Sequence, residues 1–162
     1  MTKPEYPMTR SVRALLDHKI AFTPHFYPYA DHGGTFHAAA CLNVDEHAII
    51  KTLVMETDTK LPLIVLMHGD REISTKQLAR VLGVKSVSPC TVEKTERVTG
   101  YTVGGISPLG TRRVLPVYVE RSILALPRLL INGGKRGFLI EVTPNDLGQV
   151  VALEPVDVAI EP

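Results

Sequence analysis

The hydrophobic residues of this chain recur with two different spacings, one typical of helices and the other of strands. Between residues 9 and 19 the apolar positions follow the helical spacing, which predicts an amphipathic helix. The aromatic stretch 22–29 suits a strand, but Pro24 and Pro28 confine it to a sheet edge or to a broken extended segment. Helix and strand therefore already alternate near the N-terminal end.

A capped helix and then a hairpin are expected in the next part of the chain. Thr35 is placed to cap a short alanine-rich helix that runs to about Leu42. Two strand-like runs follow at 47–57 and 61–69, and the turn-like residues 58–60 separate them. Because the two runs are close in sequence, they predict a β-hairpin with a longer loop.

The rest of the chain continues the mixture of helices and strands. Ser74 and Gln77 have the spacing of a capping box, and Gly83 is the expected end of that helix. Ser88-Pro89 is expected to open another short helix, which ends before Gly100. Further strands are predicted at 114–120, 128–132, 137–142 and 156–160, with a helix that starts at Thr143. Strands that pair locally between helices of uneven length favour an α+β fold with a mixed sheet over a regular βαβ repeat.

Composition and charge indicate only the general class of protein. The 162 residues have room for one compact domain, which is expected to cover 1–162. The net charge of +1 argues against a strong free-standing nucleic-acid binder, so no DNA partner is expected, although a local basic patch is compatible with it. Two cysteines, no secretory signal and no membrane-length apolar run predict a cytoplasmic protein without a membrane partner.

The common catalytic and metal motifs are missing from the sequence. The six histidines form no H-E-x-x-H and there is no C-x-x-C, so no metal site is expected. We interpret the histidines as surface or loop side chains, and Cys41 as a small core residue. Ser107 lies in GISPL rather than in a G-x-S-x-G elbow, and GGKRG lacks the spacing of a phosphate-binding loop.

Lys51 is the first residue that a purely structural interpretation does not explain easily. It lies within the strand-like AIIKTLVM, where both faces are largely apolar, so its ammonium has no obvious route to water. Burying such a charge without partners costs several kcal/mol. The alternative is a lysine whose side chain reaches past a sheet edge into solvent.

Two glycine-rich segments are further candidates for function. In GYTVGGISPLG, over residues 100–110, the adjacent Gly104 and Gly105 permit close backbone approach, so exposed amides could hold a carbonyl oxygen or a phosphate. A long turn between strands is the alternative. The segment NGGKRG, over 132–137, adds two positive charges, and there the alternative is a plain hairpin.

Together these segments closely resemble the YbaK family of aminoacyl-tRNA deacylases, which is related to the editing domain inserted in bacterial prolyl-tRNA synthetases. The lysine in IIKTL, the GYTVGGISPLG loop, GGKRG before a strand and the D-L helix after it carry the resemblance, which covers about residues 10–160. It implies an α+β single domain whose curved, mixed and partly barrel-like β-sheet is flanked by helices.

The resemblance also implies where the site lies. By position, Lys51 matches the family's essential lysine, and we expect it to act with Gly104 and Gly105. The implied substrate-binding residues are Tyr27, Thr52, Ile106, Ser107, Pro108, Asn132, Gly133 and Gly134. The positive side chains that we expect to contact tRNA are Lys135, Arg136, Arg112 and Arg113. No metal and no organic cofactor is implied.

The implied activity is the removal of a wrongly attached amino acid, typically cysteine, from tRNA(Pro), in trans beside prolyl-tRNA synthetase. The substrate's own thiol or a water attacks the ester, and the protein positions and polarises it. A cationic Lys51 would bind an oxygen, whereas a neutral one would act as a base, and both remain open. The alternatives are a non-catalytic module that binds tRNA or a synthetase, a small-molecule binding protein, and a deacylase for another small aminoacyl-tRNA such as Ala-tRNA(Pro).

Two positions depart from the family pattern. Relatives with cysteine activity often have a serine just before GGKRG and an acidic residue shortly after it. In this chain Asn132 stands at the position of that serine, and Phe138 and Leu139 stand where the acidic residue is expected. Because a carboxylate contact to the substrate's α-amino group is missing, we expect the pocket to select mainly by size and shape.

Overall fold

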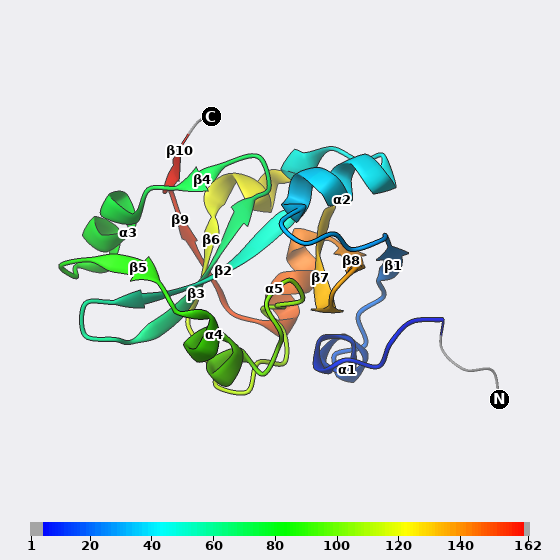
Figure 1. Cartoon of the computed structure of the whole chain (residues 1–162), viewed down its shortest axis with the longest axis horizontal. Helices are drawn as coiled ribbons and strands as arrows, with labels where there is room; N and C mark the ends of the chain where they lie inside the picture. The colour runs from blue at the N-terminus through cyan, green and yellow to red at the C-terminus, as the bar shows by residue number, and fades with distance from the viewer. Residues whose placement is uncertain (1–4, 161–162) are drawn as a thin grey trace.

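The computed structural model describes residues 5–160, and these form an α+β fold of two main sheets with helices around them (Figure 1). The helices are α1 (Arg10–Asp17), α2 (Gly34–Leu42), α3 (Thr75–Leu82), α4 (Val92–Thr99) and α5 (Pro144–Val150), with short 3-10 helices η1 (Glu46–Ala48) and η2 (Arg121–Ala125). The strands are β1 (Thr23–Phe26), β2 (Ile50–Thr57), β3 (Pro62–His68), β4 (Glu72–Ile73), β5 (Val87–Pro89), β6 (Val117–Glu120), β7 (Leu129–Lys135), β8 (Phe138–Val142), β9 (Leu153–Val156) and β10 (Ala159–Ile160).

The larger sheet has five strands in the order β5-β2-β3-β6-β9. Its centre is the β2–β3 hairpin, which confirms the hairpin predicted from the two apolar runs. β6 and β9 join it in parallel, whereas β5 pairs with β2 in the antiparallel sense. The sheet is therefore mixed, as expected.

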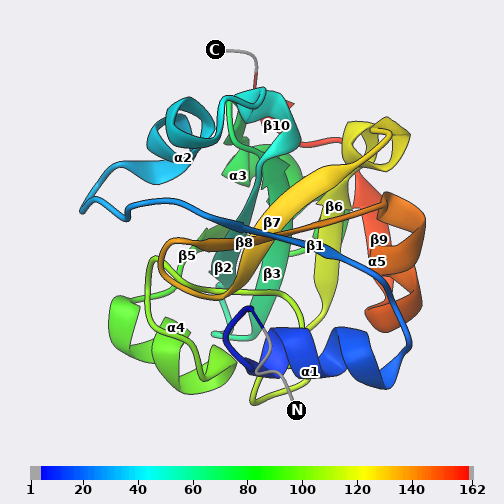
Figure 2. The ribbon, with the colours of Figure 1, turned by 90° about the vertical axis from the view of Figure 1, so that its right-hand side faces the viewer.

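The smaller sheet has the order β1-β8-β7 and lies across β2 and β3 in the view of Figure 2. β1 pairs only with β8, so the proline-containing segment is an edge strand, as its sequence predicts. One parallel bridge between Ile49 and Leu130 links the two sheets. The described strands thus form separate, bridged sheets and do not close into a barrel.

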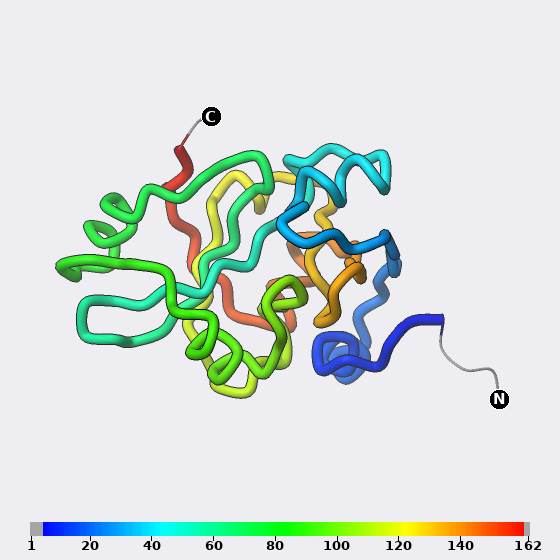
Figure 3. The backbone as a smooth tube through the Cα atoms, in the orientation of Figure 1, coloured from blue at the N-terminus to red at the C-terminus, as the bar shows by residue number. Residues whose placement is uncertain are grey.

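The main hydrophobic core lies between the two sheets and α1. It contains fully buried side chains from each layer, such as Leu15 of α1, Ile64 of β3, Ile131 of β7 and Ile140 of β8. The backbone trace in Figure 3 shows the chain passing from the larger sheet to the smaller one between β6 and β7, and back after β8. These crossings bring sequence-distant segments to one core.

Local capping signals place most helices where the sequence predicts them. The Ser74 hydroxyl accepts from the Gln77 N–H at 3.1 Å, and Gly83 ends α3 with a left-handed φ of 69°. The Thr143 hydroxyl caps α5 in the same way. Within residues 5–160, every helix is too short or too polar to cross a bilayer.

Three local predictions are wrong. Residues 87–89 form β5 instead of opening a helix, because they pair with β2, and α4 begins at Val92 behind the Thr91 cap. Thr35 does not cap α2, since its hydroxyl donates to Glu46 Oε2 at 2.7 Å. The last expected strand is two strands: β9 joins the larger sheet, and β10 pairs with β4.

Candidate active site

A cavity of about 600 Å³ opens beside β2, between the two sheets. β5 covers the edge of β2 only from Met55 to Thr57, and the bridge to the smaller sheet is at Ile49. Residues 50–54 between these points all line the cavity. Of the residues singled out by the sequence, Tyr27, Lys51, Thr52, Gly104, Ile106, Asn132 and Arg136 also line it.

Lys51 lies on the cavity wall with a half-buried side chain, which is 19% exposed. Its ammonium donates to the Arg71 carbonyl at 2.6 Å and to Glu72 Oε1 at 3.4 Å. The ammonium is therefore not buried without partners. An ammonium carries three N–H donors, so one remains after these two contacts.

Thr52 follows Lys51 and faces the opposite side of the strand. Its Oγ1 atom is buried and has no hydrogen-bond partner among residues 5–160. An unpaired buried hydroxyl costs about 1–3 kcal/mol. Because Thr52 lines the cavity, a polar group of a bound molecule is the natural partner for this oxygen.

The two glycines of the GYTVGGISPLG loop have different environments. The Gly105 N–H donates to the Thr102 carbonyl at 2.8 Å, and an added Cβ would lie 2.9 Å from backbone atoms of Lys135 and Arg136. Gly104 has a φ of 97° and lines the cavity, and its N–H makes no hydrogen bond within the described residues. Both glycines therefore permit close packing, but only the Gly104 N–H is left without a partner among the described residues.

Asn132 and Arg136 hold this loop against the β7–β8 turn. Asn132 donates to the Gly104 carbonyl at 3.1 Å and accepts from the Gly134 N–H at 2.7 Å. Arg136 donates to the Val103 carbonyl at 2.9 Å, and its guanidinium lies 5.0 Å from the centre of the Tyr29 ring. Tyr29 is a cavity residue that sequence reasoning did not select.

The remaining predicted residues do not line the cavity. Ser107 is fully buried, where it donates to Ser11 Oγ at 2.9 Å, and Pro108 is buried beside it. A Cβ at Gly133 would lie 2.4 Å from the Phe138 ring, so this glycine permits core packing. The side chains that lie exposed outside the cavity are those of Lys135, Arg112 and Arg113.

The two apolar residues after GGKRG point in opposite directions. Phe138 is 1% exposed in the main core, where its ring stacks on Phe26 at 5.2 Å. Leu139 packs with Ala38 and Ile49 and lines the cavity. Leu139 is therefore the one of the pair that borders the cavity. Burial also raises the pKa of the nearby Tyr27 hydroxyl above its ordinary value.

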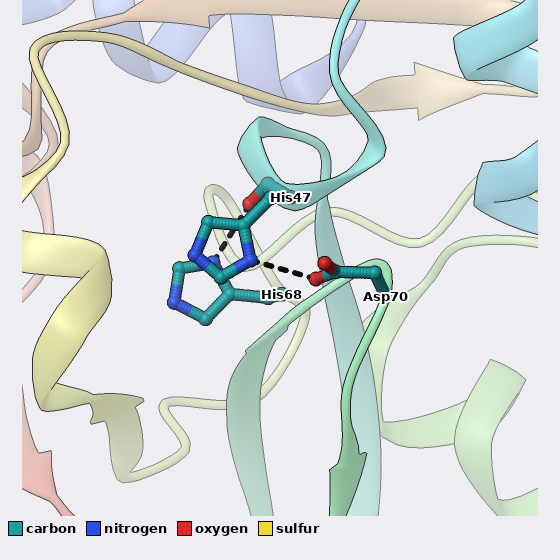
Figure 4. A group of neighbouring side chains, drawn as sticks. All are labelled: His47, His68 and Asp70. Carbon is teal, nitrogen blue, oxygen red and sulfur yellow. Dashed lines mark hydrogen bonds and ion pairs between the residues drawn. The ribbon is translucent and has the colours of Figure 1, made fainter. Parts of the chain in front are cut away.

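A second polar cluster, which sequence reasoning missed, lies at the end of β3. The His47 and His68 rings stack at 3.7 Å, and His47 Nδ1 lies 2.7 Å from Asp70 Oδ1 (Figure 4). His68 is only 1% exposed, and burial lowers its pKa, so the interpretation of all histidines as surface or loop residues is wrong. Cys41, in turn, is exposed on α2 rather than in the core. The one available signal was the position of His68 at the end of an otherwise apolar strand.

These three side chains are close enough to be considered as metal ligands. The two ring planes, however, are only 5° from parallel. Imidazole nitrogens bind a metal within the ring plane at about 2.0–2.1 Å, and parallel planes so far apart do not meet at one ion. As arranged, the cluster is a hydrogen-bonded stack.

The fold and the site together define an aminoacyl-tRNA editing domain. The chain belongs to this family, whose model matches residues 35–150. It is similar to EbsC of Enterococcus faecalis, a proposed Cys-tRNA(Pro)/Cys-tRNA(Cys) deacylase, with 29% identity over 137 residues that cover 84% of each protein.

Two further comparisons concern part of a larger protein and the fold. The proline–tRNA ligase of Streptococcus equi subsp. equi is 27% identical over 146 residues, which cover 90% of this chain but 22% of the ligase. The crystal structure of a proposed trans-editing enzyme for prolyl-tRNA synthetase has the same fold, with a TM-score of 0.83 and 23% identity over 93% of this chain and 95% of that one.

Proposed function

We propose that this protein is a trans-editing deacylase that removes a misattached amino acid, with cysteine as the best substrate, from tRNA(Pro). The observation that carries the proposal is the cavity of an editing-family domain with the Lys51 ammonium on its wall and the Gly104 amide beside it. The similarity to EbsC supports the choice of cysteine and of tRNA(Pro).

The chemistry requires little beyond positioning, because an aminoacyl ester is already activated. Attack by the substrate's own thiol forms a sulfur–carbonyl bond and breaks the ester C–O bond, and the thiol proton ends on the ribose oxygen. Attack by water instead releases the free amino acid. In both cases negative charge develops on the carbonyl oxygen, where the third Lys51 donor and the Gly104 N–H are available to stabilise it.

The contacts of Lys51 favour the electrostatic role over the role of a base. A carbonyl and a carboxylate oxygen both accept hydrogen bonds from it, as they do from an ammonium. After these two contacts an ammonium keeps a third N–H donor for a substrate oxygen, whereas a neutral amine keeps none. In this proposal Lys51 therefore binds an ester or phosphate oxygen as a cation.

The partners follow from the same site. In this proposal the phosphates of a tRNA acceptor end are attracted by positive side chains, which are those of Arg136 at the cavity and of the exposed Lys135, Arg112 and Arg113. A net charge of +1 suits weak, transient RNA binding. We also propose that this single domain forms a transient complex with prolyl-tRNA synthetase and acts in the cytoplasm.

The test is a panel of tRNA(Pro) charged with cysteine, alanine, serine, proline or a bulky residue, with loss of the ester followed over time. We expect cysteine to be released fastest, alanine and serine more slowly, and bulky residues very little. Rapid loss of alanine with cysteine untouched would overturn the cysteine assignment alone. Binding of tRNA without any ester loss would overturn the deacylase and favour a non-catalytic module.

A further inference from the structure

A continuous series of contacts connects the stacked histidines to Lys51. His68 bonds to Ser122 Oγ through Nε2 and to the His47 carbonyl through Nδ1, each at 2.7 Å. His47 in turn bonds to Asp70 through its own Nδ1 (Figure 4). The stack therefore joins η1, the end of β3 and η2.

The hydrogen-bonding roles within this stack are consistent with a neutral His68. The His47 carbonyl can only accept, so Nδ1 of His68 donates, and Nε2 accepts from the Ser122 hydroxyl. Burial, which lowers the pKa of His68, favours the same state, although the His47, Asp70 and Glu120 charges also act on it. Every ring nitrogen of His68 is thus satisfied, which makes this side of the stack rigid.

The stack holds the turn that carries the acceptor of Lys51. Asp70 Oδ1 is held by His47, and Asp70 Oδ2 lies 3.0 Å from Arg71 Nη1. The Arg71 N–H donates to the His68 carbonyl at 3.1 Å, which closes the turn. The carbonyl of the same Arg71 accepts from the Lys51 ammonium at 2.6 Å.

We infer that His47, His68 and Asp70 are positioning residues that fix the 68–71 turn and thereby hold the Lys51 ammonium at the cavity wall. Orientation of a charged group matters strongly, since a displacement of about 1 Å can cost on the order of a hundredfold in rate. The role in catalysis rests on the proposed function, whereas the placement of Lys51 does not.

The experiment first observes the ammonium itself. An ammonium held on a carbonyl exchanges its protons slowly, so Lys51 is expected to give a side-chain NH₃⁺ signal by NMR, assigned through its loss in Lys51→Ala. His47→Ala removes the donor to Asp70 and should broaden or shift this signal. His47→Asn places an amide N–H near the former Nδ1 position and should restore it.

A matched control exists in the other histidine–carboxylate pair. His25 Nε2 lies 2.8 Å from Glu141 Oε1 with similar exposure, in the smaller sheet and outside the cavity. His25→Ala should leave the Lys51 signal unchanged.

In steady-state kinetics His47→Ala should lower kcat about tenfold with KM within about twofold, and His47→Asn should recover most of the loss. Asp70→Ala, which removes the oxygen that accepts from His47, replaces His47→Ala if that variant does not fold.

Three results would overturn the inference: no slowly exchanging Lys51 ammonium in the wild type, an unchanged Lys51 signal in folded His47→Ala or Asp70→Ala, or an equal effect of His25→Ala. The NMR measurement needs no substrate. A wild-type protein that fails to deacylate but shows the expected Lys51 signals would therefore contradict the proposed function and leave the placement of Lys51 intact.

Discussion

Lys51 and Arg71 are joined by a 2.6 Å hydrogen bond from the side-chain ammonium to the backbone carbonyl. The contact explains how an apolar strand tolerates a lysine, because the ammonium meets a backbone acceptor in the turn that follows β3. Because Glu72 is 81% exposed, it adds only a weak, solvent-screened attraction. The ammonium thus has a backbone acceptor next to the cavity.

Replacing Lys51 by Ala should abolish deacylation and leave the fold intact. The variant loses the cation at the cavity, so we expect at least a hundredfold loss of kcat/KM, on the order of one lost oxyanion donor. The stability should change by less than about 1.5 kcal/mol, because one hydrogen bond of a half-buried side chain is lost. Deacylation kinetics and urea unfolding measure the two effects.

Lys76→Ala is the matched control, since Lys76 is an exposed residue of α3 outside the cavity. It should retain wild-type rates. Activity of Lys51→Ala within a few-fold of wild type would contradict the role given to Lys51.

Gly105→Ala should destabilise the protein. An added Cβ would lie 2.9 Å from the backbone of Lys135 and Arg136, which cannot move without shifting the β7–β8 turn. Overpacking of this kind costs about 1–3 kcal/mol, which thermal unfolding would detect.

Gly148→Ala tests the same change without the clash. Gly148 lies in α5, and only Leu153 Cδ1, at 3.9 Å, is near the added Cβ. We expect a gain of about 0.5–1 kcal/mol from helix propensity. Equal stability of Gly105→Ala and wild type would show that the loop does not pack against the turn as closely as the structure indicates.

Glu56→Gln should lower the free energy of unfolding at neutral pH. It should also make that free energy fall less steeply as the pH is lowered. The hydrogen bond from Lys94 lowers the pKa of Glu56 below its ordinary value of 4.5. The folded state therefore holds the proton less tightly than the unfolded state, so this contribution is present at neutral pH. It is lost as the pH falls through the lowered pKa of the folded state.

Urea unfolding between about pH 3 and pH 7 measures this effect, and Glu93→Gln on the exposed side of α4 is the control. The wild type and Glu93→Gln should lose stability in acid more steeply than Glu56→Gln. Parallel curves for all three proteins would show that the Glu56–Lys94 pair contributes nothing.

Leu139→Ala should widen the range of amino acids accepted. Leu139 borders the cavity and is 4% exposed, so its truncation leaves room beside Ala38 and Ile49. A pocket that selects by size discriminates by about 1–3 kcal/mol per methylene, so larger aminoacyl esters should gain relative to cysteine. The cost in stability should be about 2–5 kcal/mol.

The mischarged panel measures this change in selection, and Leu61→Ala serves as the control because Leu61 is 63% exposed outside the cavity. A Leu139→Ala protein that is folded and keeps the wild-type order of substrates would show that another wall of the cavity sets the size limit.

Sequence reasoning succeeded where a signal is local. The Ser74 cap, the Gly83 stop and the β2–β3 hairpin each depend on residues that are near one another in the chain, and the structure confirms them. The glycine-rich segments predicted the family by their resemblance to it, and the family model that matches residues 35–150 confirms this prediction. The helix start predicted at Ser88-Pro89 was wrong for the opposite reason. Pairing with β2, a long-range contact, outweighed the local helix-start signal.

The amino-acid order alone was therefore enough to predict the class of fold and the family, and to select Lys51 as a residue that lines the cavity. Only the tertiary structure could separate Gly104 from Gly105, turn Leu139 rather than Phe138 toward the cavity, and pair the Lys51 ammonium with Arg71. These features depend on contacts between segments far apart in sequence, such as the GYTVGGISPLG loop with the β7–β8 turn and β2 with the turn after β3. Local spacing has no information about such contacts, because packing between the two sheets creates them.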